Sequence, residues 1–145
     1  MEERIIMVSQ LEKEFESIVD KKNEPQNEKK PLLIIDDNPE VIEALRVVLN
    51  KDYKLLICYS YEEVLQKMNS EIKVVLLDIK MAYKDGIEIF SLLKNQYPNL
   101  KIIFHSAYAG NNEQAKLAES LPHSGYLTKG NYDIVELLQT IKQAF

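Results

Sequence analysis

Residues 31–145 alternate between short, uninterrupted apolar runs and longer segments in which apolar residues recur every three or four positions. The apolar runs predict strands buried on both faces, at 32–36, 53–59, 73–78, 100–105 and 125–128. The periodic segments predict helices at 39–50, after a capping box formed by Ser60 and Glu63, and at 86–97, 111–121 and 133–144. In the last helix, the apolar residues expected to face the core are Ile134, Leu137, Leu138 and Ile141.

Strands that alternate with helices indicate a parallel sheet, because the chain must cross over between parallel neighbours. Right-handed crossovers place helices on both faces of the sheet and predict an α/β fold, a doubly wound (βα)5 three-layer sandwich. Ligands of such folds bind beyond the carboxyl ends of the strands, where the strand order reverses. The residues that follow the predicted strands are therefore the candidates for a functional site.

Residues 1–30 carry 14 charged residues and predict a separate segment ahead of the domain at 31–145. Apolar residues recur there at helical spacing and predict an amphipathic helix: Ile5, Val8, Leu11, Phe15 and Ile18. Residues 20–30 have no apolar residue except Pro25 and predict a charged linker. Two interpretations of the helix stay open: it packs on its own domain, or it is a short coiled-coil or partner-docking helix.

The chain of 145 residues is 46% hydrophobic and 28% charged, an ordinary composition for one globular domain. Its net charge of −5 argues against nucleic-acid binding, which needs a basic surface. The apolar runs are too short to span a bilayer, and the charged N-terminus is unlike a signal peptide. We therefore expect a soluble, cytoplasmic protein with no DNA and no membrane partner, whose ligand is a metal ion, a phosphate group or a protein.

Three residues that are capable of metal or redox chemistry are expected to be structural. Cys58 is the only cysteine, which excludes an intramolecular disulfide, and it is expected to be buried in a strand. His105 is expected to pack on the face of its strand opposite to Ser106. His123 lies in a predicted loop with no acid beside it. Together these residues are too few for a structural zinc site.

Polar residues collect where the predicted strands end. In chain order they are Asp36, Asp37, Asp78, Ser106 and Lys129. The carboxyl ends of parallel strands lie on one edge of a sheet, so three carboxylates, a hydroxyl and an ammonium are expected to converge. Such carboxylates repel one another, and a hard divalent cation such as Mg2+ relieves the repulsion. Since a metal ion, an ammonium and a hydroxyl can each hold a phosphoryl oxygen, the sequence predicts a magnesium-dependent phosphoryl site.

These residues and the runs around them resemble the receiver domains of two-component response regulators over residues 31–145. The matching runs are Leu-Leu-Ile-Ile-Asp-Asp at 32–37, Val-Val-Leu-Leu-Asp-Ile-Lys-Met at 74–81, Asp85-Gly86, Ser106-Ala107-Tyr108 and Gly125-Tyr126-Leu-Thr-Lys129. Both their order and their spacing fit the family. The resemblance implies a flavodoxin-like fold with strand order 2-1-3-4-5, to which this chain adds an N-terminal helix.

The resemblance also implies a role for each site residue. Asp78 would be the phosphoacceptor, which takes the phosphoryl group from a histidine kinase or a phosphotransfer protein. Asp37 would bind Mg2+ directly and Asp36 through water, together with Asp78 and the backbone carbonyl of Lys80. Lys129 would contact the phosphoryl oxygens. Such a domain catalyses its own phosphorylation and slow dephosphorylation, and it is not a metabolic enzyme.

The resemblance further implies a switch that a protein partner reads. Ser106 would move toward the phosphoryl group, and Tyr126 would turn into the space that this movement opens. The face of the fourth helix, fifth strand and fifth helix would then signal to the partner. Residues 1–20 and this face are the candidate surfaces for a dimer. Because the chain ends at Phe145, we expect the output to be a protein contact unless the domain belongs to a longer chain.

Two positions depart from the family, and two others bear on the lifetime of the phosphorylated form. Ala82 and Gly130 stand where the family usually has proline, with a cis peptide often at the second position. Because a cis bond before a residue other than proline costs about 2.5–4 kcal/mol, we expect a trans peptide before Gly130. Lys80 and Tyr108 occupy positions that control access of water to the acyl phosphate in the family. Their bulk predicts slow loss of the phosphoryl group.

Three other functions fit these residues less well. A pseudo-receiver, with the same fold but no phosphorylation, would be a docking module and stays open because of the two missing prolines. A phosphatase of the haloacid dehalogenase type needs an Asp-x-Asp motif, whereas Asp36 and Asp37 are adjacent and Ile-Lys follows Asp78. A dinucleotide-binding fold needs Gly-x-Gly-x-x-Gly after the first strand, and the sequence has none.

Overall fold

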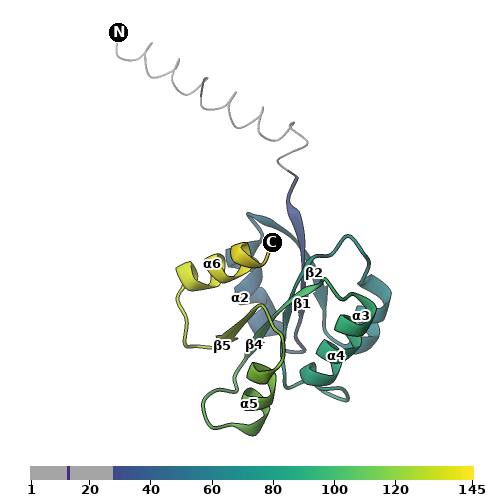
Figure 1. Ribbon diagram of the computed structural model, residues 1–145. Coiled ribbons are helices and arrows are strands. Elements are labelled where there is room, and N and C mark those ends of the chain that lie inside the picture. Colours follow the sequence, from purple (N-terminus) through teal and green to yellow (C-terminus); the bar gives the residue numbers. More distant parts are fainter. Residues whose placement is uncertain (1–12, 14–27) are drawn as a thin grey trace, which may run out of the picture.

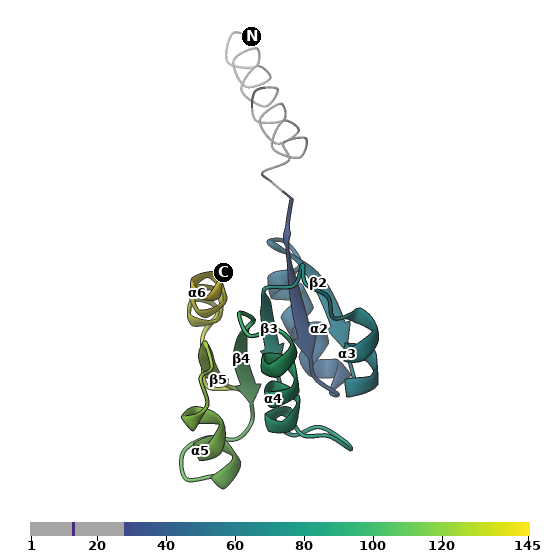
Figure 2. The same cartoon turned by 45° about the vertical axis from the view of Figure 1, so that its right-hand side comes forward.

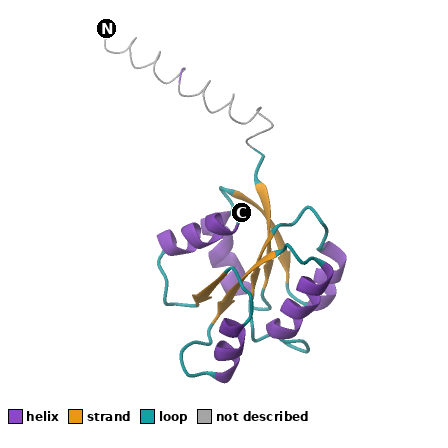
Figure 3. Cartoon of the chain, viewed as in Figure 1, coloured by secondary structure: helices purple, strands orange, loops and turns teal. Residues whose placement is uncertain are grey.

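The computed structural model of the chain describes Lys13 and residues 28–145. Strands and helices alternate along the described part (Figure 1, Figure 3). Their bounds are β1 Lys30–Ile35, α2 Pro39–Leu49, β2 Tyr53–Cys58, α3 Tyr61–Lys67, β3 Val74–Leu77, α4 Gly86–Gln96, β4 Lys101–Ser106, α5 Glu113–Ser120, β5 Gly125–Thr128 and α6 Ile134–Ala144. The amphipathic helix and most of the linker predicted at 1–30 lie outside the described residues. Within the described part, no helix has the length and apolar character that crossing a membrane requires.

The five strands form one parallel sheet in the order β2-β1-β3-β4-β5, which confirms the expected fold. Leu33 of β1 pairs with Leu56 of β2 on one side and with Val75 of β3 on the other. The chain therefore leaves β1 toward β2 and then crosses back to β3. The carboxyl ends of β1 and β3 flank this reversal of strand order, which is where ligands of doubly wound sheets bind.

Helices cover both faces of the sheet (Figure 2). Leu32 and Ile34 belong to the core under α2 and α6, and the alternate residues Leu33 and Ile35 belong to the core under α3, α4 and α5. All four side chains are buried. The two-residue period of a strand explains how one apolar run fills two cores. Each such side chain contributes roughly 1.5–3 kcal/mol, so the interior strand β1 is important for stability.

Side-chain caps start the helices and shape the loops that lead into them. Asn38 caps α2 and Asp85 caps α4. At α3, Ser60 Oγ accepts a hydrogen bond from the backbone N–H of Glu63 at 3.3 Å, and the Glu63 carboxylate accepts one from the N–H of Tyr59 at 2.7 Å. The predicted capping box is thus confirmed, with its return bond going to the residue before the cap.

The expectation that Ile134 of α6 faces the core is wrong. Ile134 is 58% exposed and its neighbour Val135 is 61% exposed, whereas Leu137 and Ile141 are buried. The reason is that α6 packs at β5, an edge strand, so only a narrow face of the helix has neighbours that cover it. The start of α6 therefore carries exposed apolar surface.

Candidate functional site

The carboxyl ends of β1 and β3 bring three acids together at one edge of the sheet. Asp36 and Asp37 follow β1 and Asp78 follows β3, and one carboxylate oxygen of each lies within 4.8 Å of the others. An open cavity of about 430 Å³ lies beside them. Its lining consists of Asp37, Asn38, Asp78, Lys80, Met81, Ala82, Ala107 and Lys129.

Asp36 is the most buried of the three acids, at 1% exposed. Its Oδ1 accepts a hydrogen bond from the backbone N–H of Asn38 at 2.9 Å, which fixes the turn into α2. Its Oδ2 is buried and has no hydrogen-bond partner, although the Lys129 ammonium lies 2.9 Å away. We interpret the contact as an ion pair, so a cation bound at this site would share the oxygen with Lys129.

Lys129 joins the end of β5 to the acids that follow β1 and β3. Its Nζ lies 2.9 Å from Asp36 Oδ2 and 3.3 Å from Asp78 Oδ2. Its backbone N–H donates to the carbonyl of Ser106 at 2.7 Å, so β4 fixes the position from which the side chain reaches across. Burial works to lower the pKa of Lys129, but the Asp36 and Asp78 carboxylates outweigh it and raise the pKa. The ammonium is therefore charged at neutral pH.

Asp78 combines burial with access to the cavity. It is 4% exposed and lines the cavity wall. Its backbone N–H donates to the carbonyl of Ile35 at 2.9 Å, which holds the end of β3 against β1. Burial and the nearby Asp36 carboxylate raise the pKa of Asp78 to about 6, although Lys129 opposes the shift. The negative charge of this carboxylate is thus incompletely compensated by the chain itself.

The donor set fits a hard divalent cation. Asp37 is exposed, and its Oδ2 accepts a hydrogen bond from the N–H of Ala82 at 3.1 Å. Around it, one ammonium faces three carboxylates, and Asp36 Oδ2 lacks a hydrogen bond. The side-chain donors are all oxygens, which Mg2+ prefers. A bound cation would offset both the burial of the Asp78 charge and its repulsion by Asp36, the two causes that raise the pKa of Asp78.

Ser106 lies beside this site without lining its cavity. The side chain is buried, and its Oγ accepts a hydrogen bond from the N–H of Tyr108 at 3.1 Å. The carbonyl of Tyr108 in turn accepts a hydrogen bond from the Tyr126 hydroxyl at 2.6 Å. Ser106 and Tyr126 thus hold the same loop residue from two elements, β4 and β5. The Tyr108 ring packs against the core under α3, α4 and α5 and does not line the cavity.

The backbone conformation explains why Ala82 and Gly130 stand where the family usually has proline. Gly130 has a φ of +78°, which glycine adopts readily and proline cannot, and the peptide before it is trans, as expected. Ala82 donates to Asp37 the N–H that a proline would lack. Lys80 is exposed and lines the cavity between these two loops.

Gly86 supports the site in a way that the sequence analysis did not assign. A Cβ at this position would collide with the carbonyl oxygen of Asp78 and would lie 2.7 Å from the Cα of Ile79. The N–H of Gly86 donates to the carbonyl of Ile79 at 2.7 Å. The first turn of α4 therefore lies directly against the backbone of Asp78. The Asp85-Gly86 pair marked a helix start, but only the packing explains why glycine is needed.

The two histidines and the cysteine lie outside the acid cluster. His105 is buried as expected, and so is Cys58, where burial raises the pKa of the thiol to about 11. The expectation that His123 has no acid beside it is wrong. Its Nε2 lies 3.1 Å from the Glu119 carboxylate, because the chain turns back after α5 and brings the two side chains together.

Comparisons with known proteins agree with this arrangement. Residues 32–142 match the response regulator receiver domain family. Over 115 residues the chain is 32% identical to the DNA-binding transcriptional regulator NtrC of Proteus hauseri. The match covers 77% of this chain and 24% of that protein. The chain therefore spans about a quarter of the length of that relative.

Two solved structures share the fold and part of the sequence. A CheY-like response regulator receiver domain protein of Methanospirillum hungatei is 26% identical, with a TM-score of 0.69, and the match covers 79% of this chain and 92% of that one. The response regulator TrrA of Thermotoga maritima, solved in complex with Mg(2+)-BeF, is 28% identical, with a TM-score of 0.65 and coverage of 80% and 99%. The matched family region includes every strand end that contributes to the acid cluster. The chain therefore belongs to the response regulator receiver domain family, the signalling domains of two-component systems.

Proposed function

We propose that the chain accepts a phosphoryl group on Asp78 from a histidine kinase or a phosphotransfer protein, with Mg2+ as cofactor. The observation that carries the proposal is the position of Lys129, whose ammonium lies 2.9 Å from Asp36 and 3.3 Å from Asp78. A phosphoryl group that enters the adjacent cavity meets a nucleophilic carboxylate and a fixed positive charge together. Membership of the receiver family supports the same chemistry.

Asp36, Asp37 and Asp78, with the backbone carbonyl of Lys80, are the groups that would hold Mg2+. When bound, the ion supplies positive charge that offsets the carboxylates and the transferring phosphoryl group. The Oδ2 of Asp36, which has an ion pair but no hydrogen bond, and the crowding of the acids support this assignment. The Mg(2+)-BeF complex of TrrA, which is 28% identical, supports it as well.

In the proposed transfer, an oxygen of Asp78 attacks the phosphorus of a phosphohistidine on the donor protein. The new P–O bond forms as the P–N bond breaks, and the imidazole keeps the electron pair of the broken bond. A carboxylate is a weak nucleophile, so compensation of charge on the transferring group is the main contribution of the site. The Lys129 ammonium already faces the attacking carboxylate and can donate to the phosphoryl oxygens as they arrive.

The switch would act through the loop that follows β4. Phosphorylation adds roughly 1.5–2 negative charges and new acceptor oxygens. The Ser106 hydroxyl would turn toward them, which breaks its bond with the N–H of Tyr108. Because Tyr126 is bonded to the carbonyl of the same Tyr108, the loop and the aromatic side chain would rearrange together.

A protein partner would read this change on the face formed by α5, β5 and α6. Exposed apolar side chains on the two helices support a protein contact there: Leu117 on α5, and Ile134 and Val135 on α6. A face whose two arrangements differ in affinity for a partner passes on the signal as a shift in populations. We place the protein in the cytoplasm with its kinase, bound to neither DNA nor membrane, as a signalling domain and not a metabolic enzyme.

The proposal includes slow spontaneous loss of the phosphoryl group. Lys80 lines the cavity and is placed to limit the approach of water, whereas the Tyr108 ring packs away from it. We therefore expect Lys80→Ala to shorten the half-life of the phosphorylated form more than Tyr108→Ala does. Equal half-lives for both variants and the natural chain would remove the role of these residues.

A pseudo-receiver that docks partners without phosphorylation is the alternative, and the two missing prolines favour it. The backbone counts against it, because Gly130 requires a positive φ and Ala82 supplies an N–H to Asp37. Both departures are thus compatible with an intact acid site.

One experiment separates the two functions. The purified chain is incubated with Mg2+ and a small phosphodonor such as acetyl phosphate, and its intact mass is measured. We expect the mass to increase by one phosphoryl group in the natural chain and in Asp52→Asn, an exposed acid far from the cluster, and to stay unchanged in Asp78→Asn. An unmodified natural chain, with folding confirmed by circular dichroism, would favour the pseudo-receiver.

A further inference from the structure

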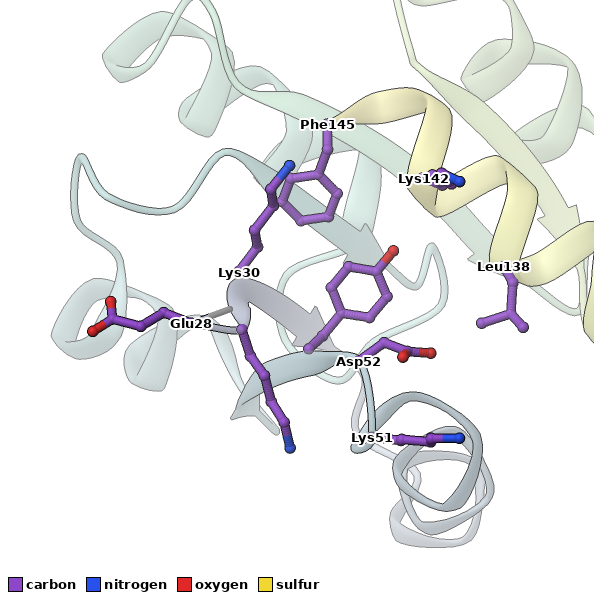
Figure 4. Close-up of a pocket in the computed structure, with 9 residues that line it drawn as sticks. Glu28, Lys30, Lys51, Asp52, Leu138, Lys142 and Phe145 are labelled. Atoms are coloured by element: carbon purple, nitrogen blue, oxygen red, sulfur yellow. The ribbon is translucent and has the colours of Figure 1, made fainter. Parts of the chain in front are cut away.

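A second pocket lies at the opposite end of the sheet from the acid cluster, where β1 and β2 begin and α6 ends (Figure 4). Its volume is about 720 Å³. Its floor is apolar and only half-buried: Tyr53, Leu138 and Phe145. The rings of Tyr53 and Phe145 stack with their centroids 5.4 Å apart and form one continuous apolar surface.

The rim of this basic pocket is rich in lysine. Four of its lining residues are lysines and two are acids, so the pocket has a net positive charge. The Lys30 ammonium lies 5.2 Å from the centre of the Phe145 ring, and Figure 4 shows the two side chains next to each other. Lys51 and Lys142 are exposed and form no ion pair within the described part of the chain. An acidic ligand with an apolar face would fit both features.

We propose that residues 1–20 of the same chain dock in this basic pocket. This segment has six acidic and two basic residues, opposite in sign to the lysine rim. At 100° per residue, the apolar residues share one face of the predicted helix: Ile5, Val8, Leu11, Phe15 and Ile18. Glu14 and Glu16 lie on the two borders of this face. The apolar face would lie on Tyr53, Leu138 and Phe145, and the bordering carboxylates would meet Lys51 and Lys142.

Chain length favours docking within one molecule. The pocket begins at Glu28, where the linker joins the domain, and Asp20 lies eight steps along the chain before Glu28. Fully extended, they span about 27 Å, enough for the segment to turn back onto the pocket. A linker of this length also gives an effective concentration on the order of millimolar, so even a weak contact would be occupied. Since α6 forms part of the pocket, the arm would touch one helix of the face that we assign to partner binding.

A spin label tests this contact in the full chain. A nitroxide is attached at Ser9→Cys, a position off the apolar face. The natural cysteine, Cys58, is buried and is therefore shielded from the labelling reagent in the folded protein. We expect the label to broaden the amide signals of Lys51, Leu138 and Phe145 and to leave those near Asp78 sharp. The broadening should be lost in Lys51→Glu/Lys142→Glu and kept in the charge-matched control Lys101→Glu/Lys116→Glu, whose lysines are exposed elsewhere.

Each remaining outcome overturns the proposal. Absent broadening at the pocket, or equal loss in both double variants, would show that the arm does not dock on this rim. A mixed sample contains isotope-labelled chain without nitroxide and unlabelled chain with nitroxide. If the broadening persists in this sample, the occupant of the pocket is a second copy of the chain. The test involves no phosphoryl group, so its result is independent of the proposed phosphorylation of Asp78.

Discussion

His105 Nε2 lies 2.6 Å from the hydroxyl of Tyr132, and the two rings meet edge to face at 5.5 Å. His105 precedes Ser106 on β4, and Tyr132 lies three residues after Lys129. The hydrogen bond therefore ties the loop after β5 to the strand that carries the proposed switch hydroxyl. Where the family usually has a proline, this chain has Gly130 with a positive φ, and a partly buried side-chain hydrogen bond holds the loop in place.

Tyr132→Phe should lower the free energy of unfolding by about 1–2 kcal/mol, because it leaves His105 Nε2 buried without a partner. Tyr59→Phe is the matched control, since the Tyr59 ring is exposed and its hydroxyl has no hydrogen bond within the described residues. Urea denaturation of the three proteins measures the difference. Equal stability of both variants would mean that the bond contributes nothing net.

Two buried groups should make opposite contributions to the pH dependence of stability in the absence of metal. Burial, with a smaller effect of Lys129, lowers the pKa of His105 to about 4, so between pH 4 and 6.5 the unfolded chain binds the extra proton and stability rises with pH. The pKa of Asp78 is raised to about 6, so between pH 4 and 6 the native chain binds the extra proton and stability falls with pH. Each effect is on the order of 3 kcal/mol.

Variants separate these two contributions. Asp78→Asn should remove the decrease in stability with pH that Asp78 causes, and leave the increase that His105 causes. Between pH 4 and 6.5 its free energy of unfolding should therefore rise by about 3 kcal/mol more than that of the double variant Asp78→Asn/His105→Phe. Denaturant titrations across this range, with a chelator present, make the comparison. Parallel curves for the single and the double variant would show that His105 is not the group responsible.

Mg2+ should stabilise the chain, because it binds the native acid cluster and not the unfolded chain. At a concentration 100 times the dissociation constant, the gain is about 2.7 kcal/mol. Asp37→Asn should lose most of this gain, while Asp52→Asn should keep it. The affinity for Mg2+ should also weaken below about pH 6, since protons then compete for Asp78. Thermal unfolding with and without Mg2+ reads out both effects, and equal gains in the two variants would contradict the assigned ligands.

Gly86→Ala should destabilise the fold by about 1–3 kcal/mol and reduce phosphorylation, because the added Cβ displaces the backbone of Asp78. Gly110→Ala is a useful contrast. Its Cβ would meet no atom within 4 Å, and only its positive φ of +61° would be strained, at about 1 kcal/mol. If phosphorylation by acetyl phosphate fell equally in the two variants, close packing at Gly86 would not be the cause.

Local patterns determined most of the architecture. The apolar runs identified the interior strands β1, β3 and β4 most directly, because strands buried on both faces need apolar residues at nearly every position. Ser60 and Glu63 located the start of α3 because capping depends only on residues a few positions apart. The strand-end positions of Asp36, Asp78 and Lys129 were sufficient to predict that they meet, since a parallel sheet puts all carboxyl ends on one edge.

Only the tertiary structure decided the features that depend on which distant segments share space. Gly86 is needed because α4 packs on the backbone of Asp78, and the bond between His105 and Tyr132 exists because β4 and the loop after β5 are adjacent. The same applies to the exposure of Ile134 at the sheet edge and to the raised pKa of Asp78. Burial and packing depend on neighbours far away in the chain, and a pattern confined to nearby residues carries no information about them.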